Sequence, residues 1–246
     1  MATSNCGTAA RSPAIRPSHP LLIMVVSALA STTSDYSATA GSFVAPPVVG
    51  LPFLRRLCPE VAEYLKAVRS RPPAHLLSIK ELRRDIDKLR DFYPPEPVHK
   101  VEDRDIPGLA GKIRVRIYTP EGKGPFPLAV FYHGGGWCIG SLNGYDGICA
   151  IIANKIPAVV LSVDYRLAPE NSYPAAFDDC YSALKYAADA ASTLNADPSR
   201  IAVMGDSAGA NLAAVVSLKS KLESGPRINL QILVYPATNL SRMDSE

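Results

Sequence analysis

The 246-residue chain has only five cysteines, and no two of them are spaced as Cys-x-x-Cys. Their odd number and scattered positions argue against a disulfide framework and against a cysteine-based metal site. The net charge of +3 is too small to indicate a nucleic-acid partner. The basic residues are dispersed, except between Arg55 and Arg90 on expected helices, where a solvated face explains them. The composition therefore gives no indication of a metal, a cofactor or a nucleic-acid partner.

The sequence also lacks a long apolar run near its start. Leu21–Ala30 is apolar but short of the about 20 residues that a membrane-spanning helix needs. Arg11 and Arg16 precede it and Ala28-Leu29-Ala30 ends it, which resembles a signal peptide with its cleavage site. A transit peptide or a disordered leader fits the same residues. Localisation therefore stays open between a secreted and a cytoplasmic protein, and residues 1–45 are treated as a leader outside the fold.

Two amphipathic helices are expected between residues 57 and 93. In the first, Val61, Leu65 and Val68 recur at helical spacing after Pro59, which suits a first helical position. In the second, Ser78-Ile-Lys-Glu81 is a capping box that marks the helix start. The helices either pack on the main domain or form a lid over a site, and the pattern alone does not decide.

From residue 98 onward the pattern is that of strands alternating with helices. Residues 98–105 and 112–118 predict an antiparallel pair, because apolar residues alternate in the second segment. Later apolar runs without alternation are typical of strands buried on both faces; they are 128–132, 158–163, 201–204 and 230–235. Helical patterns lie between them at 145–156, 174–190 and 208–223. This order predicts an α/β fold with a mostly parallel sheet.

The turn after the run at 201–204 carries Gly205-Asp-Ser-Ala-Gly209. This is G-x-S-x-G between a strand and a helix, the context of a nucleophile elbow. Gly205 and Gly209 let backbone pass where a Cβ would clash, and Ser207 stands at the tip. The following helix N-terminus favours negative charge there. An ordinary glycine-rich turn would show the same pentapeptide, so a second motif is needed.

The second motif is His133-Gly-Gly-Gly-Trp137, directly after the run at 128–132. Consecutive glycines at the carboxyl end of a buried strand lie where α/β folds place their sites. Their bare N–H groups can approach a developing oxyanion without obstruction by side chains. A flexible turn would explain the glycines alone. Together the two motifs favour acyl-transfer chemistry.

With two further motifs, the chain resembles the hormone-sensitive-lipase-like branch of the α/β-hydrolases, which includes acetyl and carboxyl esterases and arylacetamide deacetylase-type enzymes. The motifs that carry the resemblance are His133–Trp137, Asp164–Glu170, Tyr173–Asp179 and Gly205–Gly209. The resemblance implies an α/β-hydrolase fold with residues 46–97 as a helical cap segment and 98–246 as the core. It also implies a serine carboxylesterase that acts on small to medium acyl esters.

The resemblance implies a role for each motif residue. Ser207 would be the nucleophile, and the backbone N–H groups of Gly135, Gly136 and Ala208 would form the oxyanion hole. Residues that would support the two motifs are His133, Gly134, Gly205, Asp206 and Gly209. Asp206 is expected to stabilise the turn rather than act as a base, because adjacent residues on a sharp turn point apart. Residues that would brace the loop beneath the site are Asp164, Arg166 and Glu170.

No histidine follows Ser207, although the family's triad runs in the order serine, acid, histidine. The histidines all precede it: His19, His75, His99 and His133. None is placed to reach the Ser207 hydroxyl at hydrogen-bonding distance. We therefore expect that the sequence is truncated relative to the family, lacks the triad Asp and His and the last strands, and is inactive alone. The strand at 230–235 would then form an exposed apolar edge, which predicts self-association.

A second interpretation is a non-catalytic protein of the same fold. The plant gibberellin receptors resemble esterases that lost the catalytic histidine and hold a small ligand under the cap. Reversible ligand binding without turnover would distinguish such a protein from an esterase.

Overall fold

The computed structural model of the chain describes residues 59–70, 72–88 and 95–239. The predicted leader at residues 1–45 and its apolar run lie outside them. Within the described ranges, no helix combines the length and the apolar character needed to cross a membrane.

Two helices precede the sheet along the chain. They are α2 (Pro59–Arg69) and α3 (Ile79–Lys88), with a 3-10 turn at Ala74–Leu76 between them. The capping box before α3 is formed as predicted: the Ser78 N–H donates to Glu81 Oε2 over 2.8 Å and the Glu81 N–H donates to Ser78 Oγ over 3.4 Å. The two expected helices are thus confirmed.

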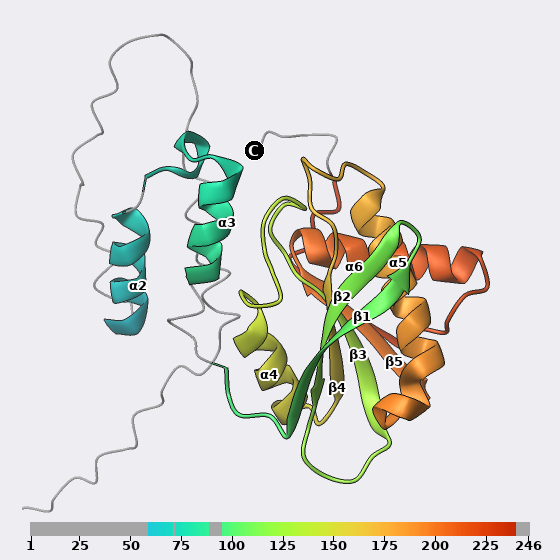
Figure 1. Cartoon of the computed structure of the whole chain (residues 1–246). Coiled ribbons are helices and arrows are strands. Elements are labelled where there is room, and N and C mark those ends of the chain that lie inside the picture. The colour runs from blue at the N-terminus through green and yellow to red at the C-terminus, as the bar shows by residue number, and fades with distance from the viewer. Residues whose placement is uncertain (1–58, 71, 89–94, 240–246) are drawn as a thin grey trace, which may run out of the picture. The chain divides into compact units, whose positions relative to one another are not determined.

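One mixed sheet organises the rest of the chain (Figure 1). Its strands are β1 (Lys100–Gly108), β2 (Gly111–Thr119), β3 (Phe126–Tyr132), β4 (Val159–Asp164), β5 (Ala196–Asp206) and β6 (Leu230–Val234). Their order is β1-β2-β4-β3-β5-β6. The pairs β1–β2 and β2–β4 are antiparallel, whereas β4–β3, β3–β5 and β5–β6 are parallel. The predicted hairpin and mostly parallel sheet are confirmed.

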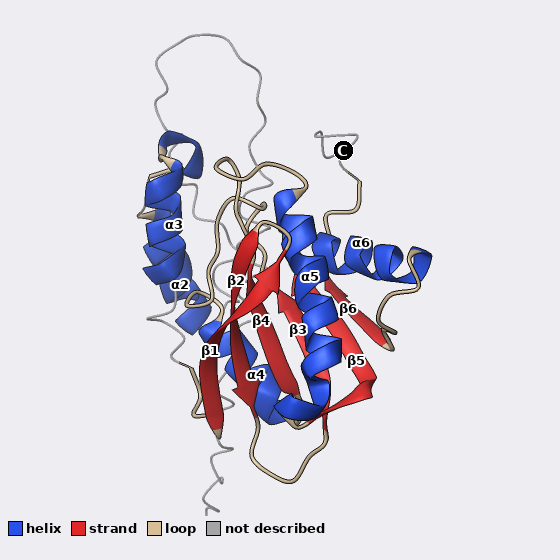
Figure 2. Ribbon diagram, turned by 45° about the vertical axis from the view of Figure 1, so that its right-hand side comes forward, coloured by secondary structure: helices blue, strands red, loops and turns tan. Residues whose placement is uncertain are grey.

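Helices cover both faces of this sheet (Figure 2). They are α4 (Asp146–Lys155), α5 (Ala175–Ala190) and α6 (Ala208–Leu222). Figures 1 and 2 show α4 on one face and the pair α5 and α6 on the other. The central strands β3 and β4 are buried almost throughout, which explains why their apolar runs do not alternate. Because β3, β4 and β5 run parallel, their carboxyl ends lie together at one edge of the sheet.

The start of β5 differs from the sequence-based expectation. Asp197-Pro198 is typical of a turn before the predicted strand at 201–204, but the strand begins at Ala196, which pairs with Phe126. The pairing register shifts between Phe126 and Leu128, so the irregular residues lie inside the strand as a bulge. Within this segment the Asp197 carboxylate accepts the backbone N–H of Ser199 at 2.8 Å.

Candidate active site

Ser207 occupies the turn between the last residue of β5 and the first residue of α6. Its backbone is in a conformation that L-residues rarely adopt, with φ 50° and ψ −117°. The Ser207 N–H donates to Val234 O of β6 over 2.9 Å, and the Ser207 carbonyl accepts the Asn211 N–H of α6 over 3.0 Å. The side chain makes no capping hydrogen bond to the helix. The neighbouring strand and helix therefore hold the strained backbone, and this leaves the hydroxyl at the tip of the turn.

The two glycines of this turn allow it to lie against the end of β3. A Cβ at Gly205 or at Gly209 would collide with the backbone carbonyl oxygen of Tyr132. At Gly209 it would also meet the carbonyl of His133 within 2.5 Å. The expected close approach of backbone on both sides of Ser207 is thus present.

The glycine loop after β3 is a tight turn. Gly135 has φ 121° and Gly136 has φ 58°, both in the region that favours glycine. The Gly135 carbonyl accepts N–H groups from Cys138 at 3.1 Å and Ile139 at 3.0 Å, which closes the turn. A Cβ at Gly135 would meet the Ile139 backbone, whereas a Cβ at Gly136 would meet nothing within 4 Å. Gly136 is therefore the open position of this loop.

Asp206 joins the two motifs. Its Oδ1 accepts the Gly134 N–H and its Oδ2 accepts the Tyr145 hydroxyl, both at 3.0 Å. The Gly134 N–H also lies 3.0 Å from the Tyr145 hydroxyl oxygen. Only 5% of Asp206 is exposed, and this burial raises its pKa to about 6. The carboxylate thus points to the glycine loop, which agrees with a role in stabilising the turn and adds partners that the sequence did not show.

His133 is fully buried and holds the glycine loop from inside. Its ring stacks on Tyr165 with centroids 4.2 Å apart, and its Nδ1 lies 2.8 Å from the Gly134 carbonyl oxygen. Because a carbonyl only accepts, Nδ1 carries the proton. Nε2 has no hydrogen-bond partner among the described residues. Burial lowers the pKa of the imidazole to about 4. Neither ring nitrogen is hydrogen-bonded to Ser207, since Nδ1 is bound to Gly134 and Nε2 has no partner among the described residues.

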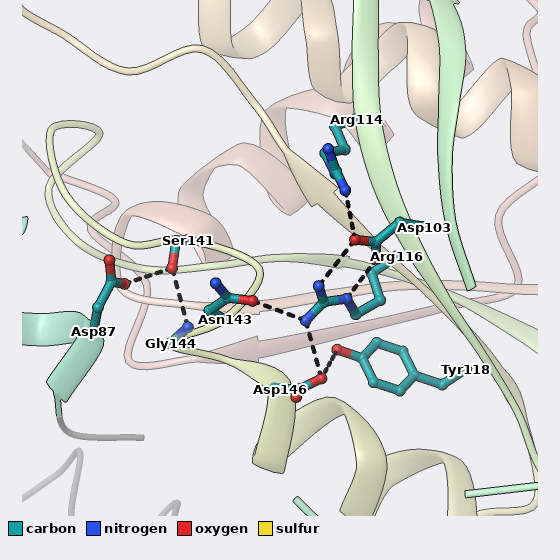
Figure 3. A network of polar contacts seen from close by, with 9 residues as sticks. All are labelled: Asp87, Asp103, Arg114, Arg116, Tyr118, Ser141, Asn143, Gly144 and Asp146. Atoms are coloured by element: carbon teal, nitrogen blue, oxygen red, sulfur yellow. Dashed lines mark hydrogen bonds and ion pairs between the residues drawn. The ribbon is translucent and has the colours of Figure 1, made fainter. Parts of the chain in front are cut away.

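The loop that leads from the glycine turn to α4 is anchored at two points (Figure 3). Ser141 Oγ donates to Asp87 of α3 over 2.5 Å and accepts the Gly144 N–H over 3.0 Å. Further along, Arg116 Nη1 donates to Asn143 Oδ1 over 3.1 Å. The same guanidinium also binds Asp103 and Asp146. The loop is therefore fixed both to α3 and to β2.

A cavity of about 650 Å³ opens beside the Arg116 network. Arg116, Tyr118 and Asp146 contribute to its wall together with apolar residues of the segment before β1. No residue of the Ser207 turn or of the glycine loop lines it. This cavity is therefore separate from the candidate active site.

Two of the three residues expected to brace the loop, Arg166 and Glu170, make ion pairs. Arg166 binds the buried Asp179 through Nε at 2.8 Å and Nη2 at 2.9 Å. Glu170 pairs with Arg83 of α3. Asp164 ends β4 opposite Arg114, and burial raises the pKa of its carboxyl.

Sequence reasoning missed three residues at this site: Tyr145, Tyr165 and Arg83. Tyr165 donates its hydroxyl to the His133 carbonyl over 2.7 Å, and it lies inside a motif that was recognised only as a whole. Tyr145 immediately precedes α4, and no local pattern connects it to Asp206.

Cys138, Cys149 and Cys180 are free thiols. Within the ranges described above, no group of three or more His, Cys, Asp or Glu side chains could hold a metal ion.

A serine held with positive φ between a parallel strand and a helix, packed against a glycine loop at the carboxyl edge of the sheet, defines an α/β protein with a nucleophile elbow. Comparison with known proteins supports the fold. Residues 129–246 match the family model described as alpha/beta hydrolase fold, and the chain has this fold.

Several relatives are named as esterases. The chain is 47% identical over 157 residues to the carboxylic ester hydrolase LipN of Mycobacterium tuberculosis, an alignment that covers 61% of this chain and 42% of the relative. It is 43% identical over 140 residues to arylacetamide deacetylase of Oryctolagus cuniculus, covering 54% of this chain and 35% of the relative. The resemblance to the esterase and arylacetamide deacetylase branch is confirmed.

A solved structure shares the fold. The hyperthermophilic esterase from Pyrobaculum calidifontis superposes with a TM-score of 0.66 at 43% sequence identity, covering 69% of this chain and 56% of the esterase. The chain spans about half the length of the curated relatives it matches, with 42%, 49% and 47% of the first three covered.

Proposed function

We propose that the protein is a serine carboxylic-ester hydrolase that acts on small to medium acyl esters through an acyl-enzyme. The observation that carries this proposal is the position of Ser207, at the tip of a strained turn that Asp206 ties to the glycine loop through Gly134. The names of the relatives support the same chemistry.

In the proposed mechanism, Ser207 Oγ attacks the carbonyl carbon of the ester while a general base takes the hydroxyl proton. The N–H groups of Gly135, Gly136 and Ala208 stabilise the oxyanion, and the N-terminus of α6 favours the same negative charge. The alcohol leaves with a proton, and water then hydrolyses the acyl-enzyme. None of the described residues is assigned as the base, since His133 is fully buried and neither of its ring nitrogens is hydrogen-bonded to Ser207.

We assign residues 46–97 to a helical cap segment over the acyl pocket and residues 98–246 to the hydrolase core. The contacts that support this assignment come from α3. Arg83 and Asp87 of this helix bind the loop that begins with the glycine turn, at Cys138 and Ser141 respectively.

The proposal is tested by hydrolysis of p-nitrophenyl acetate with the longest product of the reading frame, its Ser207→Ala variant and the control Ser192→Ala, since the 246 residues alone are expected to be inactive. Ser192 is an exposed serine in the 3-10 turn after α5. We expect burst release that Ser207→Ala reduces by about 10³-fold or more, and that Ser192→Ala leaves unchanged. Hydrolysis that survives in Ser207→Ala contradicts the assignment of the nucleophile.

The second candidate is a non-catalytic binding protein of the same fold. It is favoured by the buried state of His133, whose Nδ1 is bound to the Gly134 carbonyl. Reversible binding of a small ester analogue, without turnover and without labelling by a serine-directed phosphonate, would support it. The same assay is run on a longer product wherever the reading frame continues past Glu246, which separates an inactive segment from a non-catalytic protein.

A further inference from the structure

Arg83 of α3 binds acceptors on two separate loops. Its Nε donates to the Cys138 carbonyl over 2.8 Å, and its Nη2 donates to the Ala168 carbonyl over 2.9 Å. Nη1 and Nη2 also bind the two carboxylate oxygens of Glu170, at 3.0 and 2.7 Å. The planar fork of an arginine can serve all these acceptors at once, whereas the single ammonium of a lysine cannot.

The two loops are also joined to one another at this point. The Ala168 N–H donates to the Trp137 carbonyl over 2.9 Å, and the Cys138 N–H closes the glycine turn on Gly135. Arg83 therefore binds the backbone directly beside both of these links. Four residues later on α3, Asp87 binds Ser141 at the far end of the same loop.

The two kinds of contact differ in how much water surrounds them. The ion pair is open to solvent, with 27% of the Arg83 side chain and 52% of the Glu170 side chain exposed. Such exposed ion pairs contribute little to the stability of a fold. The bonds to the two carbonyls are partly buried. The carbonyl contacts are thus the ones that can fix the shape of the loop.

We infer that Arg83 is a positioning residue, which holds the turn from Gly135 to Cys138 in the shape that aims its N–H groups at an oxyanion. This inference rests on the proposed function. It makes α3 a support for the oxyanion loop, in addition to any part it has in covering the acyl pocket.

The first measurement is amide hydrogen exchange on the whole chain, which needs no catalysis. We expect Arg83→Ala to speed exchange of the Cys138, Ile139 and Ala168 amides by about tenfold or more, since these bonds would open locally. Arg83→Lys keeps the charge but cannot bind all these acceptors at once. Its Cys138, Ile139 and Ala168 amides are therefore expected to exchange as fast as those of Arg83→Ala. Glu170→Gln removes the ion pair alone and should stay close to wild type.

Arg84→Ala is the matched control, because Arg84 is the next residue on α3, carries the same charge and is exposed. It should leave exchange in the glycine loop unchanged. If Arg83→Ala also leaves this exchange unchanged, the inference is overturned. If Arg83→Ala does not fold, Arg83→Lys and Glu170→Gln still separate the carbonyl contacts from the ion pair.

The second measurement is the separation of kcat from KM with p-nitrophenyl acetate, in whichever form of the protein hydrolyses it. Displaced oxyanion donors should lower kcat by about 10- to 100-fold in Arg83→Ala and Arg83→Lys, since removal of one donor costs more than that. KM should change little, and Glu170→Gln should keep its kcat. A raised KM with unchanged kcat, or an equal loss of kcat in Glu170→Gln, contradicts the inference.

The two measurements also separate this inference from the proposed function. If no form of the protein hydrolyses esters, the proposed function fails, and hydrogen exchange alone decides whether Arg83 holds the loop.

Discussion

Asp206 and His133 lie on either side of Gly134, and burial moves their pKa values in opposite directions. The pKa of Asp206 rises to about 6 and that of His133 falls to about 4. As pH rises from about 4 to 6, the unfolded chain loses the Asp206 proton first, so this group lowers stability. Over a similar range the unfolded chain also gives up the His133 proton that the folded state does not hold, so this group raises stability. The two contributions oppose each other.

The variant Asp206→Asn separates the contribution of Asp206 to the pH dependence of stability from that of His133. Asp206→Asn removes one titration, so the unfolding free energy of the wild type minus that of the variant should fall as pH rises from about 4 to 6, by up to about 3 kcal/mol. Above pH 7 the difference should be flat. Urea unfolding at a series of pH values measures it, with the exposed Asp189→Asn as the control. A difference that does not change with pH contradicts the raised pKa of Asp206.

The glycines of the two motifs also differ in what they tolerate. Gly209→Ala should lower the unfolding free energy by about 1–3 kcal/mol, because its Cβ would collide with the carbonyls of Tyr132 and His133. Gly136→Ala meets no neighbouring atom and should cost only about 1 kcal/mol, from its positive φ. Urea unfolding of both variants tests the order. Equal losses would show that the turn relaxes around the added methyl group.

At the scale of elements, the sequence predicted those features that depend on residues close together in the chain. The capping box at Ser78 and the burial of β3 follow from neighbouring residues, and both were predicted from them. The partners of Arg83 at Cys138 and Ala168 lie 55 and 85 positions away, so no spacing rule could find them. The same holds for the link from Asp206 to Tyr145, and for the early start of β5, which depends on its pairing with β3. The motifs were thus predictable from the sequence, and the contacts that join them were not.

The capping box gives a prediction about α3 as a whole. Ser78→Ala removes the side-chain acceptor of the Glu81 N–H and the hydroxyl that donates to Glu81 Oε2, and should destabilise the helix by about 1 kcal/mol. Because α3 carries Arg83, exchange should rise modestly in the glycine loop as well as in the helix. Hydrogen exchange measures both segments, with Ser192→Ala as the control. Faster exchange in α3 alone would show that the helix frays without releasing Arg83.

At the scale of the molecule, β6 is the outer strand of the described sheet, paired only with β5. Its first residue, Leu230, is 54% exposed, and Leu218 and Leu222 of α6 are 58% and 75% exposed. Unpaired backbone groups next to exposed apolar side chains are a template for pairing with another chain. The 246-residue chain is therefore expected to self-associate through β6.

Leu230→Lys tests this edge, because a charge on an outer strand opposes pairing with a second strand. The wild-type chain should sediment increasingly as dimers or larger species over an about hundredfold rise in concentration, as mass action requires. Leu230→Lys should shift this equilibrium toward monomer. Leu109→Lys is the matched control, since Leu109 is 73% exposed in the β1–β2 turn, away from the β6 edge. A wild-type chain that sediments as monomer throughout would exclude association, and an equal effect of both lysines would show that added charge, rather than the strand edge, controls it.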